Sequence, residues 1–268
     1  MAGWDFTVYF LSTAFITKLS KLCNKHHYNN NNWPLSLHKK RPQGDRIMSA
    51  SVDLLQQRTL DDSEKLCDLF TSSITLATML RQRKMAAWMR QEFDGYTDPA
   101  AAPPFRRDIS GHIVVKSPQY GWVQAPVNEE QTEQFGLVDL PDSVRYLENA
   151  CLSSKKGSSH RVKLAPDVMK ELQQQVHLMA DLAISVNRSE YCKILQTLRG
   201  ALYLWCNALL EAGLAGEFNH YSSEQKEQAA DLDTPQSFWR AAMEQRKSLP
   251  IPDVREASLF DRMFGRTG

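Results

Sequence analysis

The sequence WMRQEFDGY, residues 88–96, separates two kinds of pattern along the chain. Upstream of it, apolar residues recur at steps of three and four, which predicts amphipathic helices with one face toward a core. Asp94-Gly95 should end the last of these helices, because glycine accepts the left-handed backbone of a helix C-terminus and Pro99 soon forbids continuation. Downstream, the pattern becomes that of short strands. Residues 88–96 therefore predict the boundary between a helical unit and a sheet.

Residues 52–93 predict three helices. The first is short and holds Leu54 and Leu55. The segment DDSE, residues 61–64, predicts a capping box for the second helix. In such a box the Asp61 side chain accepts a hydrogen bond from a backbone N–H of the first turn, and the Glu64 side chain accepts one in return from the Asp61 N–H. The apolar stripes of the second and third helices consist of Leu66, Leu69, Phe70, Ile74, Ala77 and Leu80, and of Met85, Trp88, Met89 and Phe93. We expect both stripes to face a core.

Short strands follow a linker of small residues at 100–104. Apolar residues flank Gly111 and appear again after a turn at residues 117–121, which predicts two or three short strands. Residues 162–164 predict another strand. These segments are too short and too few for a large sheet, so we expect a small antiparallel one.

Later helices complete the predicted fold. One follows Leu140-Pro141, a second has Pro166 in its first turn, and the longest runs from about residue 189 to 212, ahead of Gly213. The longest is also the most apolar element of the chain. We predict an α+β fold that is predominantly helical, with an N-terminal three-helix unit, a small antiparallel sheet and a long C-terminal core helix.

The charge balance divides the chain near Met48. The 268 residues carry a net charge of +1, with 42% hydrophobic and 24% charged residues, which is typical of globular proteins. Residues 1–47 hold seven Lys and Arg against two Asp, a net charge of +5, and the other 25 basic and 29 acidic groups leave −4. This mildly acidic body is a poor match for a phosphate backbone, so a nucleic-acid role would need the front segment or a local patch.

We predict three parts: residues 1–47, a domain at 48–213, and a C-terminal extension at 214–268 with short amphipathic helices and a polar tail. Residues 1–47 are either a disordered basic arm or sequence upstream of a misplaced start, and we favour the second, with Met48 as the natural initiator. Their apolar run has Asp5 before it and Lys18 and Lys21 after it, the reverse of a secretory signal.

The cysteines and histidines predict no metal site. The five cysteines are widely spaced and form no Cys-x-x-Cys pair, so neither a disulfide framework nor a zinc ribbon is expected. Three of them fall in apolar helical patterns and should pack as small hydrophobes: Cys67, Cys192 and Cys206. The front segment's histidines lack the spacing of metal ligands: His26, His27 and His38. We expect no cofactor, no membrane span, because no run of about 18 apolar residues occurs, and a reducing, cytoplasmic location.

The sequence contains none of the motifs that would require an enzyme. It has no Gly-x-Ser-x-Gly elbow, phosphate loop, His-Glu-x-x-His helix or dinucleotide fingerprint. Its densest polar cluster consists of Glu92, Asp94, Asp98, Arg106 and Arg107. Carboxylates beside guanidinium groups could position a phosphate or a water, with Glu92, Asp94 and Arg106 as the catalytic candidates. A surface ion-pair network is the interpretation that we favour.

Several aromatic residues and one histidine allow two interpretations each. His112, in the strand region, is either a proton carrier or a packed core residue, and we expect packing. Trp205 lies on the stripe of the longest helix and should be core. Phe238-Trp239 is the candidate for an interface with a partner, because aromatic residues are enriched where proteins meet, although docking onto the chain's own domain is favoured.

Residues 88–96 resemble the AbiTii domain of bacterial abortive-infection, or phage-resistance, proteins. The family pattern Trp-x-x-x-Glu-Leu-x-Gly-Tyr is matched by Trp88, Glu92, Phe93, Gly95 and Tyr96, with Phe93 in place of leucine. A shorter match precedes this motif at residues 51–55, and others follow it in the family's order at 105–106, 125–127, 147–148 and 198–210. Departures also occur at Val127 and at residues 203–206. The resemblance covers about residues 51–213.

The resemblance implies a cytoplasmic role in antiviral defence, alone or with a companion product that halts an infected cell. It supplies no catalytic residues. Our hypothesis is action through contacts with proteins, such as a companion defence protein, a phage component or a second copy of the chain. One rival is an effector enzyme, such as a nuclease or other toxic hydrolase, with its site around Glu92, Asp94 and Arg106. The other rival is the regulatory half of a toxin pair.

Overall fold

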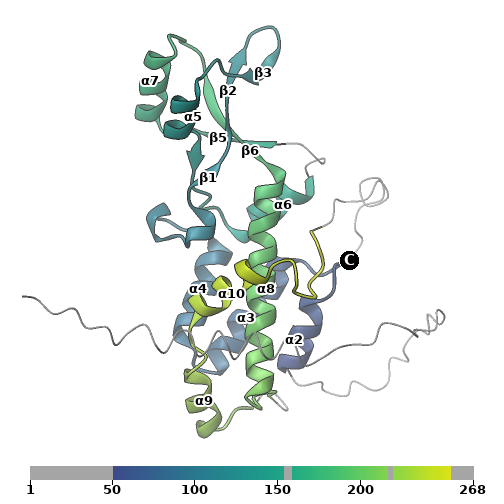
Figure 1. The fold of residues 1–268 in the computed structure, drawn as a ribbon. Helices are drawn as coiled ribbons and strands as arrows, with labels where there is room; N and C mark the ends of the chain where they lie inside the picture. The colour runs from purple at the N-terminus through teal and green to yellow at the C-terminus, as the bar shows by residue number, and fades with distance from the viewer. Residues whose placement is uncertain (1–50, 154–158, 217–219, 255–268) are drawn as a thin grey trace, which may run out of the picture. The chain divides into compact units, whose positions relative to one another are not determined.

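The structure is a computed structural model that describes residues 51–153, 159–216 and 220–254 (Figure 1). By its internal contacts the chain divides into Met1–Ile47 and Met48–Gly268, and every described residue belongs to the latter. The basic front segment with its three histidines therefore lies outside the described residues. So does most of the loop at residues 153–159.

The predicted helical unit is confirmed. Three helices form at the N-terminal side, α2 (Ser51–Thr59), α3 (Leu66–Met79) and α4 (Arg83–Asp94). The later helices that pack with them are α6 (Val144–Ser153), α8 (Arg188–Glu211), α9 (Ser223–Ala230) and α10 (Pro235–Gln245). The core helix α8 contacts α2, α6 and α10, and Trp205 on it is fully buried, as expected. No helix of the described residues is long and apolar enough to cross a membrane.

Close packing against α8 depends on a small residue and on a buried polar link. A Cβ atom at Gly200 would lie 3.1 Å from the Cβ of Ala242 in α10, so only glycine permits this approach without a shift. The Trp205 indole donates to Gln82 Oε1 at 2.9 Å, and Gln82 Nε2 donates to the Ala229 carbonyl at 2.6 Å. Residues beyond 213 therefore pack into the same core as the residues before it.

The predicted capping box of α3 is wrong. Asp61 accepts from the backbone N–H of Ser63, and Glu64 pairs with Arg58 at 2.9 Å. The helix begins later, at Leu66, whose N–H donates to Glu148 Oε1 at 2.7 Å. Glu148 lies in α6, so the first turn of α3 is satisfied by a distant segment. A local sequence motif cannot reveal such a partner.

The sheet is small and antiparallel, as predicted. It has the order β3 (Gly121–Gln124), β2 (His112–Ser117), β6 (Leu182–Asn187), β5 (Ser159–Lys163). A separate pair joins β1 (Ile109–Ser110) to β4 (Leu137–Val138). Two helices accompany the sheet, α5 (Glu129–Phe135) and α7 (Pro166–Gln175). The sequence pattern predicted neither α5 nor the strand β6. It missed β6 because this strand is buried over five consecutive residues and shows no alternation.

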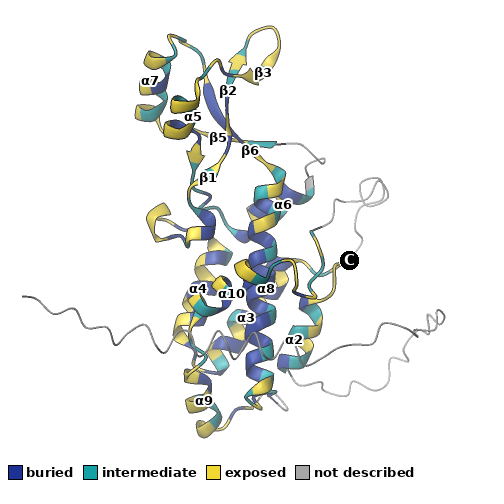
Figure 2. Cartoon of the chain, viewed as in Figure 1, coloured by how far each residue is buried: buried dark blue, intermediate teal, exposed yellow. Residues whose placement is uncertain are grey.

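The strand β6 joins two apolar cores. Leu182 packs with Ile113, Phe135 and Leu172 beneath α5 and α7. Two residues further on, Ile184 belongs to the large core of the helices. β6 is buried from Leu182 to Val186, and Figure 2 shows that β3 is mostly exposed. Because β6 runs directly into α8, the sheet is anchored to the core helix.

A disulfide bond contradicts the expectation from cysteine spacing. Cys151 in α6 is bonded to Cys192 in α8, across a sequence separation of 41 residues. No spacing motif marks such a pair, because the two helices meet only in the folded chain. Among the described cysteines, Cys67 and Cys206 are free and buried, as expected of small hydrophobes. Burial raises the pKa of the Cys206 thiol, which keeps it protonated.

Candidate functional site

The charged cluster at the end of α4 contains a buried ion pair. Arg106 Nη2 lies 2.6 Å from Glu92 Oε2, and neither side chain is exposed to solvent. Glu92 comes from the last turn of α4, and Arg106 comes from the short helical turn η2 (Pro104–Arg106). The expected surface network is therefore wrong for these two residues. Removal of both charges from water makes the pair depend on further hydrogen bonds.

Those hydrogen bonds come from the residues of the sequence motif. The Trp88 indole and the Tyr96 hydroxyl both donate to Glu92 Oε1, at 3.0 and 2.7 Å. Arg106 Nη1 donates to the carbonyls of Leu140 and Asp142, at 2.9 and 2.7 Å. Burial, followed by the negative charge of Glu92, raises the pKa of Tyr96 and keeps its hydroxyl a donor. We call Trp88, Glu92, Tyr96 and Arg106 the buried hub.

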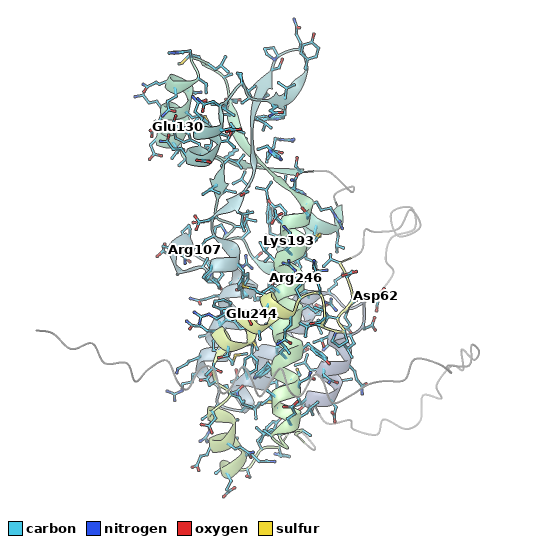
Figure 3. All side chains as sticks on the ribbon, viewed as in Figure 1. Asp62, Arg107, Glu130, Lys193, Glu244 and Arg246 are labelled. Carbon is cyan, nitrogen blue, oxygen red and sulfur yellow. A yellow bond between two sulfur atoms is a disulfide. The ribbon has the colours of Figure 1, made fainter. Side chains whose placement is uncertain are left out.

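Other members of the predicted cluster lie elsewhere. Asp94 is exposed, so the structure does not unite it with Glu92 and Arg106. The Asp98 carboxylate accepts from the backbone N–H of Ala100 at 3.0 Å and caps η1 (Pro99–Ala101). Arg107, labelled in Figure 3, is partly buried. Of the three catalytic candidates, two meet in the hub and the third faces solvent.

The rest of the motif holds the end of α4 in place. Gly95 has a φ of +94°, and a Cβ atom there would lie 3.0 Å from the Pro141 carbonyl oxygen and from the Ser143 nitrogen. The Tyr96 N–H donates to the same Pro141 carbonyl at 2.8 Å. Phe93 is half-buried against the helical core. The helix end at Gly95, predicted from sequence, is confirmed and binds the segment that precedes α6.

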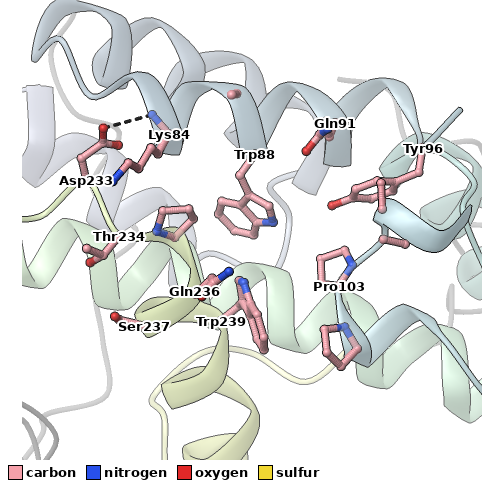
Figure 4. A pocket seen from close by; sticks show the side chains of 15 residues that line it. Lys84, Trp88, Gln91, Tyr96, Pro103, Asp233, Thr234, Gln236, Ser237 and Trp239 are labelled. Atoms are coloured by element: carbon pink, nitrogen blue, oxygen red, sulfur yellow. Dashed lines mark hydrogen bonds between the residues drawn. The ribbon is translucent and has the colours of Figure 1, made fainter. Parts of the chain in front are cut away.

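A pocket of about 700 Å³ lies beside the hub. Its walls are α4, the linker that holds η1 and η2, and the start of α10 with the residues before it (Figure 4). The aromatic side chains that line it are Trp88, Tyr96 and Trp239, and prolines of the linker add to them. The hub thus forms part of the pocket wall, through Trp88 and Tyr96.

The polar residues of the pocket are mostly neutral. Gln91 and Gln236 line it and are exposed, and Ser237 lies beside them. Asp233 also lines it, but its carboxylate accepts from the N–H groups of Lys84 and Met85, at 3.0 and 2.7 Å, and so caps α4. Figure 4 draws the Lys84 bond as a dashed line. Sequence reasoning missed Asp233 and Gln236, since neither belongs to a motif.

The structure places both interface candidates within the chain's own core. Phe238 is 1% exposed, and Trp239 is 6% exposed and contacts the Phe105 ring at 5.6 Å between centroids. This is the docking onto its own domain that we favoured. Trp239 still lines the pocket, so part of its surface can meet a partner. The expectation that His112 packs in the core is wrong, because His112 is exposed on the sheet.

The geometry offers little for catalysis at this place. Glu92 and Arg106 are buried and paired with each other, and neither lines the pocket. Within residues 51–153, 159–216 and 220–254, no group of three or more His, Cys, Asp and Glu is arranged to hold a metal ion. The pocket can instead accept an apolar or aromatic group and donate hydrogen bonds from its two glutamines.

A comparison with family models matches residues 52–234 to the model named AbiTii. The matched region contains the whole hub and extends beyond the resemblance seen in the sequence, to the residues that cap α4. No curated protein and no solved structure matched the chain.

Proposed function

The chain belongs to the AbiTii family, and from that premise we propose that it serves abortive-infection defence against phage by binding another protein. The contact is made at the pocket between α4 and α10. The single observation that carries this proposal is the state of the hub. Its ionisable pair, Glu92 and Arg106, would be the catalytic groups of the rival enzyme hypothesis, but it is enclosed behind the pocket wall.

Because the hub is buried, we assign the charges of Glu92 and Arg106 a structural role. A catalytic acid or base has to reach the substrate, within about 3 Å or through one water. Glu92 and Arg106 are both 0% exposed. Their ion pair fixes the linker against the end of α4, so they shape the pocket without facing its interior.

The composition of the pocket supports a protein contact. The centres of protein interfaces are enriched in aromatic residues and depleted of charge. Here three aromatic side chains and the linker prolines surround two neutral glutamines, and the only charged residues among the described ones that line the pocket are Lys84 and Asp233. The partner that fits is a protein that inserts one large apolar or aromatic side chain, which would act as an anchor in the pocket.

Phage plating tests this proposal. Ala87 lines the pocket and is exposed on α4, so Ala87→Arg fills the pocket with a charged side chain and leaves the core intact. Thr75→Arg is the matched control, because it places the same group on an exposed position of α3 outside the pocket lining. The proposal expects protection to be lost with Ala87→Arg and kept with Thr75→Arg, at equal protein levels. Full protection by Ala87→Arg would contradict it.

A further inference from the structure

The four-stranded sheet has a covered face and an exposed one. Side chains that lie opposite each other in the register share a face. The pairs Ile113–Ile184 and Val115–Leu182 lie on the covered face and pack into the two apolar cores. The registers of β2, β3, β5 and β6 place the neighbouring residues on the other side. This open face, as we call it, carries His112, Lys116, Trp122, Arg161, Lys163 and Asp181.

Positive charge is concentrated on the open face. Lys116, Arg161 and Lys163 are exposed there. Asp181 provides one negative charge, 4.0 Å from Lys116 Nζ. The near-neutral charge of the whole chain conceals this surface, which is the local patch that an anionic partner would need.

The two helices on the covered face carry a net negative charge, which in α7 comes from Asp167 and Glu171 against Lys170. α5 has the sequence EEQTEQF, with three glutamates and no basic residue. Glu130 of α5 is labelled in Figure 3. The sheet and its helices are therefore electrostatically polarised, with the open face positive. Charge complementarity selects an anionic partner for that face.

An aromatic ring and a guanidinium group lie together on the open face. The Arg161 guanidinium carbon lies 5.4 Å from the centroid of the Trp122 ring. The two residues belong to β5 and β3, the two edge strands, so the pair reaches across the sheet. Between them, β6 contributes the short side chains of Ala183 and Ser185, which are buried. The guanidinium lies over the face of the ring, so the two side chains form a stack that is flanked by lysines.

We propose that the open face binds single-stranded nucleic acid. A base adds to the outer side of the Trp122–Arg161 stack, because bases stack on aromatic rings and on guanidinium groups alike. Lys116 and Lys163 contact the phosphates on either side. An acidic protein segment would use the lysines but would leave the stacking surface without a role, so the nucleic acid fits the observations better.

This surface is distinct from the pocket between α4 and α10, so its test is independent of the proposed function. Fluorescence anisotropy with the full chain would measure binding of fluorescein-labelled oligouridine and oligothymidine, each about twelve nucleotides long, which distinguishes RNA from DNA. With two phosphate contacts, affinity for single strands should fall about sevenfold between roughly 50 and 200 mM salt. A polyglutamate peptide serves as the acidic protein alternative.

Two variants test the residues of the open face, and one serves as the matched control. Lys163→Glu and Trp122→Leu should each weaken binding about tenfold, through a lost phosphate contact and a lost stacking surface. Lys170→Glu makes the same charge change on an exposed position of α7, the helix that packs on the covered face, and should leave the affinity unchanged. The basic residues 1–47 are present in every variant, so any contribution they make to the affinity is the same in each.

The result expected is binding of at least one of the two oligonucleotides, with losses confined to the open-face variants. Three outcomes would overturn the proposal: no binding of either strand, equal losses with Lys163→Glu and Lys170→Glu, or polyglutamate binding as tightly as the oligonucleotides. Thermal unfolding of each variant separates a loss of contact from a loss of folding. If Trp122→Leu unfolds, Lys163→Glu alone decides between the outcomes.

Discussion

Glu92 and Arg106 form an ion pair of 2.6 Å in which neither side chain contacts solvent. The pair lies where the helix α4 ends and the linker passes back toward α6, and it holds these segments together. Its charges are neutralised by each other, Glu92 Oε1 accepts from Trp88 and Tyr96, and Arg106 Nη1 donates to two backbone carbonyls. Glu92 and Arg106, which the sequence offered as catalytic candidates, therefore stabilise the fold.

Removal of Glu92 should destabilise the protein strongly. Glu92→Ala leaves Arg106 charged and buried without its partner, which typically costs about 3–5 kcal/mol. Asp94→Ala, two residues away and exposed, should change the free energy of unfolding by less than about 0.5 kcal/mol. Urea denaturation of both variants measures the difference. Equal stability of the two would show that the hub does not hold the fold.

The variant Asp94→Ala also distinguishes a binding function from a catalytic one. An effector enzyme with its site around Glu92, Asp94 and Arg106 would lose protection in Asp94→Ala, although the fold is intact. Our account expects Asp94→Ala to protect cells as well as the unchanged protein does. Plating efficiency of phage on cells that produce each protein provides the answer. Loss of protection by a folded Asp94→Ala protein would favour the enzyme.

Tyr96 predicts a loss of stability at alkaline pH. Burial raises the pKa of Tyr96 above the ordinary tyrosine value of about 10. Above that pH the unfolded chain loses the phenolic proton and the folded chain keeps it, so the free energy of unfolding falls as the pH rises. Tyr96→Phe should show a shallower fall between about pH 9 and 11, measured by denaturation at each pH. Identical slopes in the two proteins would exclude Tyr96 as the source.

Gly95 should tolerate no side chain. Gly95→Ala combines a positive φ with a Cβ atom 3.0 Å from two backbone atoms, and we expect a loss of about 2 kcal/mol or more. Gly213→Ala is the matched control, because Gly213 also has a positive φ but has no atom within 4 Å of the added Cβ. It should lose about 1 kcal/mol from backbone strain alone. Denaturation curves that rank the two variants in the opposite order would contradict the close approach at Gly95.

The disulfide between α6 and α8 should contribute to stability. Closure of a loop of 41 residues by Cys151–Cys192 limits the unfolded chain and is worth about 4 kcal/mol on the chain-entropy model. A reductant should therefore lower the melting temperature by about 10 °C. The Cys151→Ser, Cys192→Ser double variant should melt at the lower temperature with or without reductant. Alkylation of both thiols in the unreduced, unfolded protein would show that the bond is absent.

Local patterns predicted the parts of the fold that depend on local physics. The helical stripes, the end of α4 at Gly95 and the first turn of α7 at Pro166 follow from periodicity and backbone preference. The cap of α3 by Glu148 and the Cys151–Cys192 bond join distant segments, so no pattern marks them. β6 was missed because a strand that is buried on both faces shows no alternation.

The candidate site was predicted only in part, for the same reason. The motif of residues 88–96 marked Trp88, Glu92 and Tyr96 as important, and it carried the family resemblance. It could not show that Arg106 lies against Glu92 inside the protein, because burial depends on segments from the linker and from residues 140–142. The wall of the pocket that α10 supplies lies more than 130 residues away in sequence.

Photo-crosslinking from the pocket tests the central claim most directly. A photo-reactive residue in place of Gln91, which lines the pocket, would be activated in phage-infected cells that produce the full chain. Our account predicts one discrete adduct with another protein, kept in the Thr75→Arg background and lost together with protection in the Ala87→Arg background. Protected cells that yield no adduct, or an adduct unchanged by Ala87→Arg, would contradict the claim that the protein acts by binding a partner at this pocket.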